Sequence, residues 1–127
     1  MKTGIKGEMS VLVTEAMTAE AMGSGDLPVY ATPSMIALME NTAKDSISGE
    51  LAEGQGTVGT LMQIEHVSAT PVGMKVRCET ELVEVDRKRL VFEVKAFDEK
   101  GLIGQGRHER FVIDNERFLA KAEAKKN

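Results

Sequence analysis

The sequence predicts an α+β domain in which one long helix is wrapped by a curved antiparallel sheet of about five strands. Three observations lead to this fold class: one strand pattern comes first, one long helical pattern follows Thr32, and strands alternate with tight turns from residue 57 to about 113. The 127 residues fit a single domain spanning 1–127. A chain of this length can bury one substantial hydrophobic core.

The first strand is predicted over residues 8–16, where apolar and polar residues alternate. Its inward positions are Met9, Val11 and Val13. The segment MGSGDLP then predicts a loop, because glycine, serine and proline favour turns.

The helix is predicted to begin just after Thr32, which precedes Pro33 as an N-cap precedes a proline at the first helical position. It runs for about 19 residues, roughly 28 Å at 1.5 Å per residue, with Gly49 a weak point near its end. Residues 35–39 are all apolar, so other structure should wrap the first half of this helix.

Four strands are predicted after the helix, over residues 57–70, 74–85, 90–97 and 102–113. The short connections between them indicate three successive hairpins and hence an antiparallel meander. The last residues, 115–127, form a short helix that frays at its charged end. One sheet curled around one helix leaves its other face and its edges uncovered, and a homodimer would cover them.

Composition excludes several classes of protein. The net charge is −4 and the basic residues are scattered among acidic ones, so no nucleic-acid partner is expected. No apolar run approaches the roughly 20 residues of a membrane span, and the first residues lack a secretory signal, so we expect a cytoplasmic protein without a membrane partner. The single cysteine, Cys78, excludes an internal disulfide and a cysteine-based metal cluster, and its strand position predicts a buried, inert thiol.

Two side chains stand in unusual settings for their chemistry. Glu40 directly follows the apolar run of the helix, where an ionised carboxylate is costly unless it is paired. Such a group can act as a general base or nucleophile, or it can simply mark the point where the helix turns a polar side to solvent. His66 shares its strand face with Met62 and Ile64, which is typical of a hydrogen-bonded core histidine and equally compatible with a catalytic imidazole.

Two further positions have structural explanations. Helix capping fully accounts for Thr32. His108 shares a strand face with Gly104 and Gly106, where the absence of a Cβ lets another backbone approach closely, and this indicates a packing role.

The chain resembles the hotdog-fold thioesterases, and among them the fluoroacetyl-CoA thioesterase-like family. The similar stretches are VYATPSMIALMENTA, EGQGTVGTLMQIEHVSATPVGMKV, RLVFEVKAFDEKGLIGQGRHER and FVI, within residues 29–113. The resemblance implies a hotdog fold and a catalytic set of Thr32, Glu40 and His66. It also implies a substrate-binding role for Gly59, whose backbone would lie near the thioester, and for Arg110.

Acyl-CoA hydrolysis is the activity that this resemblance implies, with no cofactor and no metal. Glu40 would be the nucleophile or general base, His66 would protonate the departing thiolate, and Thr32 would orient one of them. If Thr32 caps the helix, Glu40 lies eight residues on, roughly 12 Å along the axis, and the two side chains cannot touch. Either the helix begins later and Thr32 folds back, or the site is shared between two subunits, as the resemblance to hotdog dimers favours. The family forms homodimers, and two dimers could associate further.

The acyl group and two rival functions stay open. The fluoroacetyl enzyme has an aromatic gate before its threonine, whereas this chain has Asp26 and Leu27 there, which favours a general small or short-chain acyl-CoA. A hotdog hydratase would need a histidine in the helix, and none is present. A non-catalytic module that binds or senses acyl-CoA would need neither Glu40 nor His66.

Overall fold

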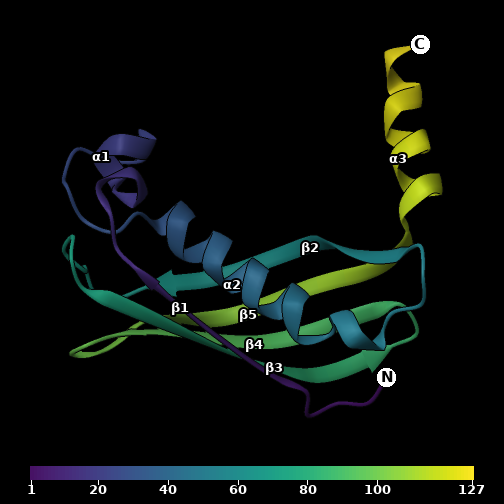
Figure 1. Cartoon of the computed structure of the whole chain (residues 1–127), viewed down its shortest axis with the longest axis horizontal. Helices are drawn as coiled ribbons and strands as arrows, with labels where there is room; N and C mark the ends of the chain where they lie inside the picture. The colour runs from purple at the N-terminus through teal and green to yellow at the C-terminus, as the bar shows by residue number, and fades with distance from the viewer.

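In the computed structural model of residues 1–127, one long helix lies across a five-stranded antiparallel sheet (Figure 1). The strand order is β1-β3-β4-β5-β2, so β1 and β2 form the two edges. The strands are β1 (Lys6–Leu12), β2 (Gln55–His66), β3 (Lys75–Asp86), β4 (Arg89–Asp98) and β5 (Gly101–Asp114). The predicted α+β class, with one helix packed on one sheet, is confirmed.

The connection between β2 and β3 differs from the prediction. The two strands do not form a hairpin, because β2 pairs with β5 along its whole length. Residues 67–74 cross the end of the sheet over three strand spacings, roughly 14 Å, which is within the roughly 26 Å that eight extended residues can span. Pro71 has no N–H to offer a hairpin, and the Val67 N–H donates to the Ile103 carbonyl of β5 instead. The hairpins β3–β4 and β4–β5 are confirmed.

Helix α2 (Thr32–Ser46) begins one residue earlier than predicted. Its N-cap is Ala31, which offers no side-chain cap, and Pro33 is the second helical residue. The prediction that Thr32 caps the helix is therefore wrong. Because the Thr32 hydroxyl is not used as a cap, it is free to contact another element.

The helix also ends earlier than predicted, after 15 residues. Near its end the Ser46 hydroxyl donates to the Ala43 carbonyl, and the Ser48 hydroxyl donates to the Asp45 carbonyl. Serine side chains that bond nearby carbonyls in this way compete with the helical pattern. A short 3₁₀ turn, η2 (Ser48–Glu50), follows before the chain enters β2.

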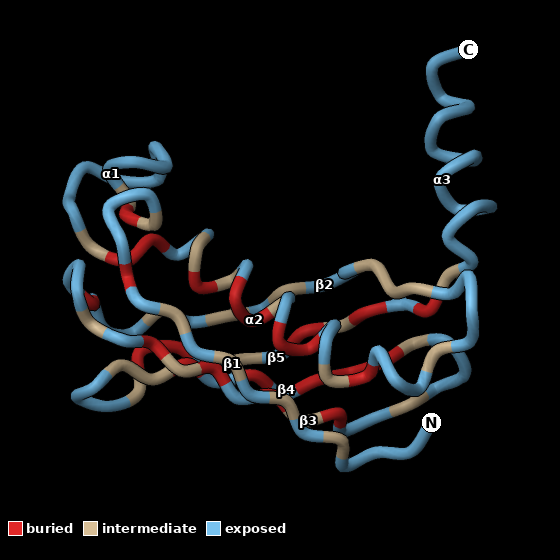
Figure 2. Tube along the Cα trace, in the orientation of Figure 1, coloured by how far each residue is buried: buried red, intermediate tan, exposed pale blue.

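The hydrophobic core lies between α2 and the inner face of the sheet, where Figure 2 shows the buried residues. Cys78 is buried there, as predicted, and burial raises the pKa of its thiol, which stays protonated. The main members of the core are Met35, Leu38, Met39, Ala43, Ile47, Val76, Cys78, Leu82, Phe92, Val94, Ala96 and Ile103.

One side of α2 is left uncovered by the chain itself. Pro33 and Ala37 are exposed and Ile36 is half-buried, although the sequence predicted that this part of the helix would be wrapped on all sides. The neighbouring strand β2 has a free edge, and Leu61 on it is 41% exposed. An uncovered apolar helix face beside a free strand edge is a surface suited to a partner.

Four short helical segments complete the chain. A 3₁₀ turn, η1 (Glu15–Met17), and helix α1 (Ala19–Met22) lie beside the N-terminal end of α2, and helix α3 (Asn115–Glu123) stands away from the sheet (Figure 1). The one-turn η3 (Ala124–Lys126) continues α3, so the predicted C-terminal helix is confirmed. None of the helices has the length and apolar character needed to cross a membrane.

Candidate active site

The sequence-predicted site residues lie on α2, on the edge strand β2 and on β5. Thr32 and Glu40 come from α2, while Gly59 and His66 come from β2. Arg110 comes from β5, which pairs with β2. The structure joins these five residues in two separate groups, one with Thr32 and His66 and one with Glu40, Gly59 and Arg110.

The first group is a hydroxyl and an imidazole. Thr32 Oγ1 lies 2.7 Å from His66 Nδ1, so the first residue of α2 is hydrogen-bonded to the last residue of β2. The other ring nitrogen, His66 Nε2, is buried and has no partner within the chain. Burial lowers the pKa of His66. A largely neutral imidazole with one free nitrogen can exchange a proton with a ligand.

An open hollow of about 300 Å³ surrounds this pair. Most of the residues around it are small, and the N-terminus of α2 adjoins it. Because Ala31 provides no side-chain cap, the first N–H groups of α2 are available to stabilise negative charge. The lining residues are Ala19, Ser24, Val29, Tyr30, Thr32, His66, Val67, Ser68 and Ala69.

The second group is centred on the Glu40 carboxylate. Glu40 lies against Gly59, where a Cβ would come within 2.7 Å of Glu40 Oε2, so only glycine leaves room for the carboxylate. The pairing of β2 with β5 shifts register between Gly59 and Leu61, a bulge of the kind often found beside active sites. The expectation of a dry setting for Glu40 is wrong for the single chain, because its side chain is 44% exposed. It faces an open hollow of about 240 Å³.

The buried guanidinium of Arg110 lies next to the Glu40 carboxylate. Arg110 Nη1 lies 3.8 Å from Glu40 Oε2, and the Arg110 side chain is only 7% exposed. Burial lowers the pKa of Arg110, and the charge of Glu40 acts in the opposite direction. Arg110 occupies the same strand face as His108 and Val112, which the alternation of β5 turns inward. A charged residue on a buried face was the signal in the sequence that could have identified this contact without the family resemblance.

His108 is buried against the same network. Its Nδ1 lies 2.9 Å from the Leu61 carbonyl oxygen, and its Nε2 lies 3.2 Å from Arg110 Nη1. Its ring also stacks on Phe92. His108 is buried, which fits the packing role predicted for it, but the sequence reasoning missed its contact with Arg110.

The two groups do not meet within one chain. Eight residues of helix separate Thr32 from Glu40, which is roughly 12 Å along the axis of α2. Seven residues of strand separate Gly59 from His66, roughly 23 Å in extended geometry. Glu40 therefore cannot contact His66 directly in this arrangement.

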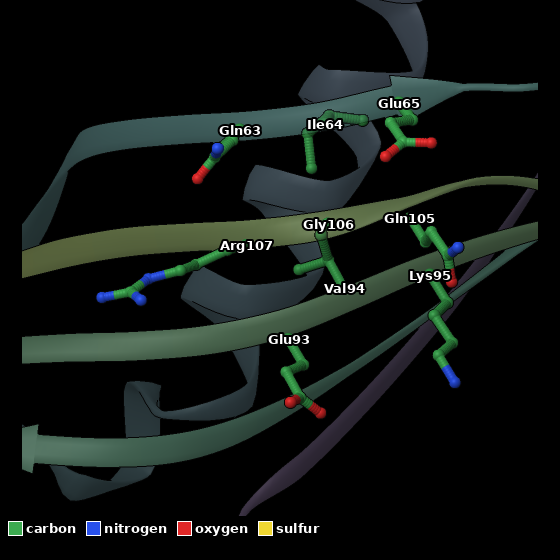
Figure 3. A pocket seen from close by; sticks show the side chains of 9 residues that line it. All are labelled: Gln63, Ile64, Glu65, Glu93, Val94, Lys95, Gln105, Gly106 and Arg107. Atoms are coloured by element: carbon green, nitrogen blue, oxygen red, sulfur yellow. The ribbon is translucent and has the colours of Figure 1, made fainter.

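A larger hollow, about 610 Å³, lies on the outer face of the sheet, away from α2 (Figure 3). Its lining is dominated by long polar side chains, and it contains none of the site residues predicted from the sequence. We place the candidate site on the α2 side for that reason. The polar residues that line the outer hollow are Gln63, Glu65, Glu93, Lys95, Gln105 and Arg107.

Comparison with known sequences finds one family model, described as fluoroacetyl-CoA-specific thioesterase, which matches residues 13–116. The fluoroacetyl-CoA thioesterase of Streptantibioticus cattleyicolor is 40% identical over 97 residues, which cover 76% of this chain and 70% of that protein. The match therefore includes both groups of the candidate site.

Comparison with solved structures gives the same result. A fluoroacetyl-CoA thioesterase variant in complex with acetyl-CoA has a TM-score of 0.94 and 32% identity, with 100% of both chains covered. A thioesterase superfamily member from Thermus thermophilus has a TM-score of 0.91 and 29% identity, covering 98% of this chain and 93% of that one. A hot-dog-like protein from Thermanaerovibrio acidaminovorans, at 21% identity and a TM-score of 0.91 over 100% and 94% of the two chains, shares the fold. The predicted hotdog fold is confirmed.

Proposed function

Because this chain belongs to the fluoroacetyl-CoA-specific thioesterase family and is an acyl-CoA thioester hydrolase, we propose that Glu40, His66 and Thr32 carry out its reaction on a small acyl-CoA. The observation that carries this proposal is the pair of open hollows beside α2 and β2. One hollow presents an imidazole bonded to a hydroxyl, and the other presents a carboxylate backed by a buried cation.

The proposed reaction divides proton transfer between the two groups. Glu40 accepts a proton from water as the water oxygen attacks the thioester carbonyl carbon. In the alternative, a Glu40 oxygen attacks that carbon, and water then hydrolyses the resulting acyl–Glu40 anhydride. The carbon–sulfur bond breaks, the protonated form of His66 gives its proton to the departing CoA thiolate, and His66 then takes up a proton again while Glu40 releases the one it accepted. Thr32 holds the imidazole through Nδ1, so the buried Nε2, which has no partner within the chain, is the nitrogen left for this transfer. N–H groups beside Gly59 or at the start of α2 stabilise the oxyanion.

A homodimer is part of this proposal, because one chain leaves Glu40 and His66 apart. The uncovered face of α2 contains Pro33, Ile36 and Ala37, in helical register with Glu40. It adjoins the free edge of β2. A second copy docked along that edge would bury both surfaces and bring the two groups of one chain close to those of the other. Two dimers could then associate further.

Small acyl groups are the proposed substrate class. The hollow at His66 is bordered by Ala19, Ser24 and Ala69, whose side chains are short and leave about 300 Å³ of open space. At the positions before Thr32 where the fluoroacetyl enzyme has its aromatic gate, this chain carries Asp26 and Leu27, and both are exposed. We therefore propose hydrolysis of small and short-chain acyl-CoA esters in general, rather than of fluoroacetyl-CoA alone.

The test is a panel of acyl-CoA esters from acetyl to octanoyl, with fluoroacetyl-CoA included, followed by the release of free thiol with a thiol-reactive dye. We expect turnover of the short members and a decline with chain length. Turnover of fluoroacetyl-CoA alone would overturn the substrate class. Binding of CoA esters with no hydrolysis of any of them would favour the ligand-sensing alternative.

Light scattering tests the dimer separately. The chain has a mass of 13.8 kDa, so a dimer should scatter as a particle of twice that mass. A stable monomer at assay concentrations, with full activity, would contradict a site shared between subunits. The charged substitution Ala37→Glu on the uncovered helix face should weaken the dimer, whereas Lys121→Glu on α3 should not.

A further inference from the structure

We infer that His108 is a positioning residue for Glu40: it accepts a hydrogen bond from Arg110 and so aims that cation at the carboxylate. The inference deepens the proposed function and rests on the role of Glu40 in it. His108 lines the hollow that Glu40 faces, but both of its ring nitrogens are already occupied, so it offers a ligand no free polar atom there. The polar effect of His108 on the reaction therefore passes through Arg110.

The hydrogen bonds define the protonation state of His108. Its Nδ1 faces the Leu61 carbonyl oxygen, which can only accept, so Nδ1 must carry the hydrogen. Its Nε2 faces Arg110 Nη1, which can only donate, so Nε2 must present a lone pair. His108 is thus the neutral, Nδ1-protonated tautomer. Burial is the main reason that the pKa of His108 is lowered, and a lowered pKa agrees with a neutral ring.

The hydrogen-bond partners of Arg110 explain why the neutral state of His108 matters for Glu40. Arg110 Nε donates to Thr57 Oγ1 at 2.8 Å, and Nη2 donates to the Thr57 carbonyl oxygen at 3.0 Å. With His108 on Nη1, three neutral acceptors hold the guanidinium. The only carboxylate near it is that of Glu40, at 3.8 Å. The positive charge is therefore fixed in place by neutral groups, and the carboxylate that it faces is that of Glu40.

Arg89, another arginine of the same sheet, differs from Arg110 in the groups that hold it. Arg89 is held by two carboxylates, donating to Glu109 Oε1 at 2.9 Å and to Glu84 Oε2 at 2.7 Å. Its charge is compensated locally, as in an ordinary ion pair on a protein surface. A carboxylate in place of His108 would compensate Arg110 in the same way and remove its influence on Glu40.

His108 is itself rigidly held, as a positioning residue must be. The hydrogen bond to Leu61 ties it to β2 one residue past the bulge that begins at Gly59, and the Phe92 ring stacks at a centroid distance of 6.1 Å. A Cβ on Gly59 would lie 3.3 Å from His108 Cε1 and 2.7 Å from Glu40 Oε2. The bulge, the imidazole and the carboxylate thus pack against one another directly.

Two substitutions separate the two hydrogen bonds of His108. In His108→Gln the terminal amide reaches the place of Nε2, where its oxygen can accept from Arg110. In His108→Asn the amide ends near the place of Nδ1, where its N–H can donate to Leu61, but the bond to Arg110 is lost. We expect His108→Asn to lower kcat about tenfold or more with KM little changed, and His108→Gln to keep kcat within about threefold of wild type.

The controls distinguish this inference from its alternatives. Urea unfolding of both variants measures any loss of stability; equal losses of kcat and of stability in the two variants would show a packing role only and overturn the inference. Wild-type kcat in His108→Asn beside an inactive Glu40→Gln variant would overturn it as well, while leaving the proposed function intact. Wild-type turnover in Glu40→Gln would instead overturn the proposed function.

The protonation state of His108 can also be measured directly in the wild-type protein, without an activity assay. The chain contains two histidines, so ¹⁵N spectra of the imidazoles can be assigned with one His66→Gln variant. At pH 7 we expect His108 to give one protonated nitrogen, Nδ1, and one unprotonated nitrogen, Nε2. A doubly protonated ring, or a proton on Nε2, would contradict the hydrogen bond from Arg110.

Discussion

The two groups of the candidate site are built in different ways. In the Glu40 group, the carboxylate lies against Gly59 and near a buried guanidinium that is itself held by Thr57 and His108. In the other group, His66 is held by a single hydroxyl and keeps one nitrogen without a partner. The first arrangement suits a charge that must stay in one place, and the second suits a group that exchanges protons with a ligand.

Removal of the negative charge of Glu40 should have the largest effect on hydrolysis. Glu40→Gln keeps the shape of the side chain but can neither accept a proton nor attack a carbonyl carbon, so we expect hydrolysis to fall by at least about 10²-fold. The rate of hydrolysis is measured as the steady-state release of free thiol. Glu50→Gln, at an exposed position in η2, is the matched control and should leave the rate unchanged. A Glu40→Gln variant as active as the wild type would remove Glu40 from the reaction.

Crowding the same carboxylate should have the next largest effect. In Gly59→Ala the added methyl group would stand 2.7 Å from Glu40 Oε2, so the carboxylate must move, and we expect a loss of roughly 10- to 100-fold in kcat. Gly49→Ala is the control, since no atom lies within 4 Å of the added Cβ. Unchanged kinetics in Gly59→Ala would mean that the position of Glu40 is not critical.

In the group formed by Thr32 and His66, two substitutions of Thr32 either remove its hydroxyl or retain it. Thr32→Ala leaves His66 Nδ1 without its partner, and we expect about a tenfold fall in kcat, the size of one lost hydrogen bond of about 1.4 kcal/mol. Thr32→Ser keeps the hydroxyl and should stay within about threefold of the wild type. Equal losses in the two variants would show that the methyl group, rather than the hydrogen bond, is what matters.

The smallest expected effect is on stability. Burial lowers the pKa of both His66 and His108, so below a pH of about 6.5 the unfolded chain binds protons that the folded chain does not. The free energy of unfolding should fall as the pH drops from 7.5 to 5.5, because the unfolded state is favoured by each extra proton. Urea titrations should show a smaller fall in His108→Gln, which retains only one such histidine. An identical fall in both proteins would contradict the buried, neutral state of His108.

The site was partly predictable from the sequence. Glu40 stood out because it interrupts an apolar helix, and His66 because it shares a strand face with apolar residues. Thr32 was misassigned as a helix cap, since the local pattern Thr-Pro is the same whether the hydroxyl bonds its own helix or a distant imidazole. The contact between His108 and Arg110 was missed, although both residues lie on the inward face of β5.

The sequence by itself determined the five strands, the one long helix and the inward faces of the strands, because these follow from local periodicity and turn chemistry. Only the tertiary structure decided that β2 pairs with β5 at the sheet edge, and that Glu40 and His66 belong to two separate groups of contacts. Such pairings depend on contacts between residues far apart in the chain, and a turn such as Thr-Pro-Val-Gly fits a hairpin and a crossover equally well.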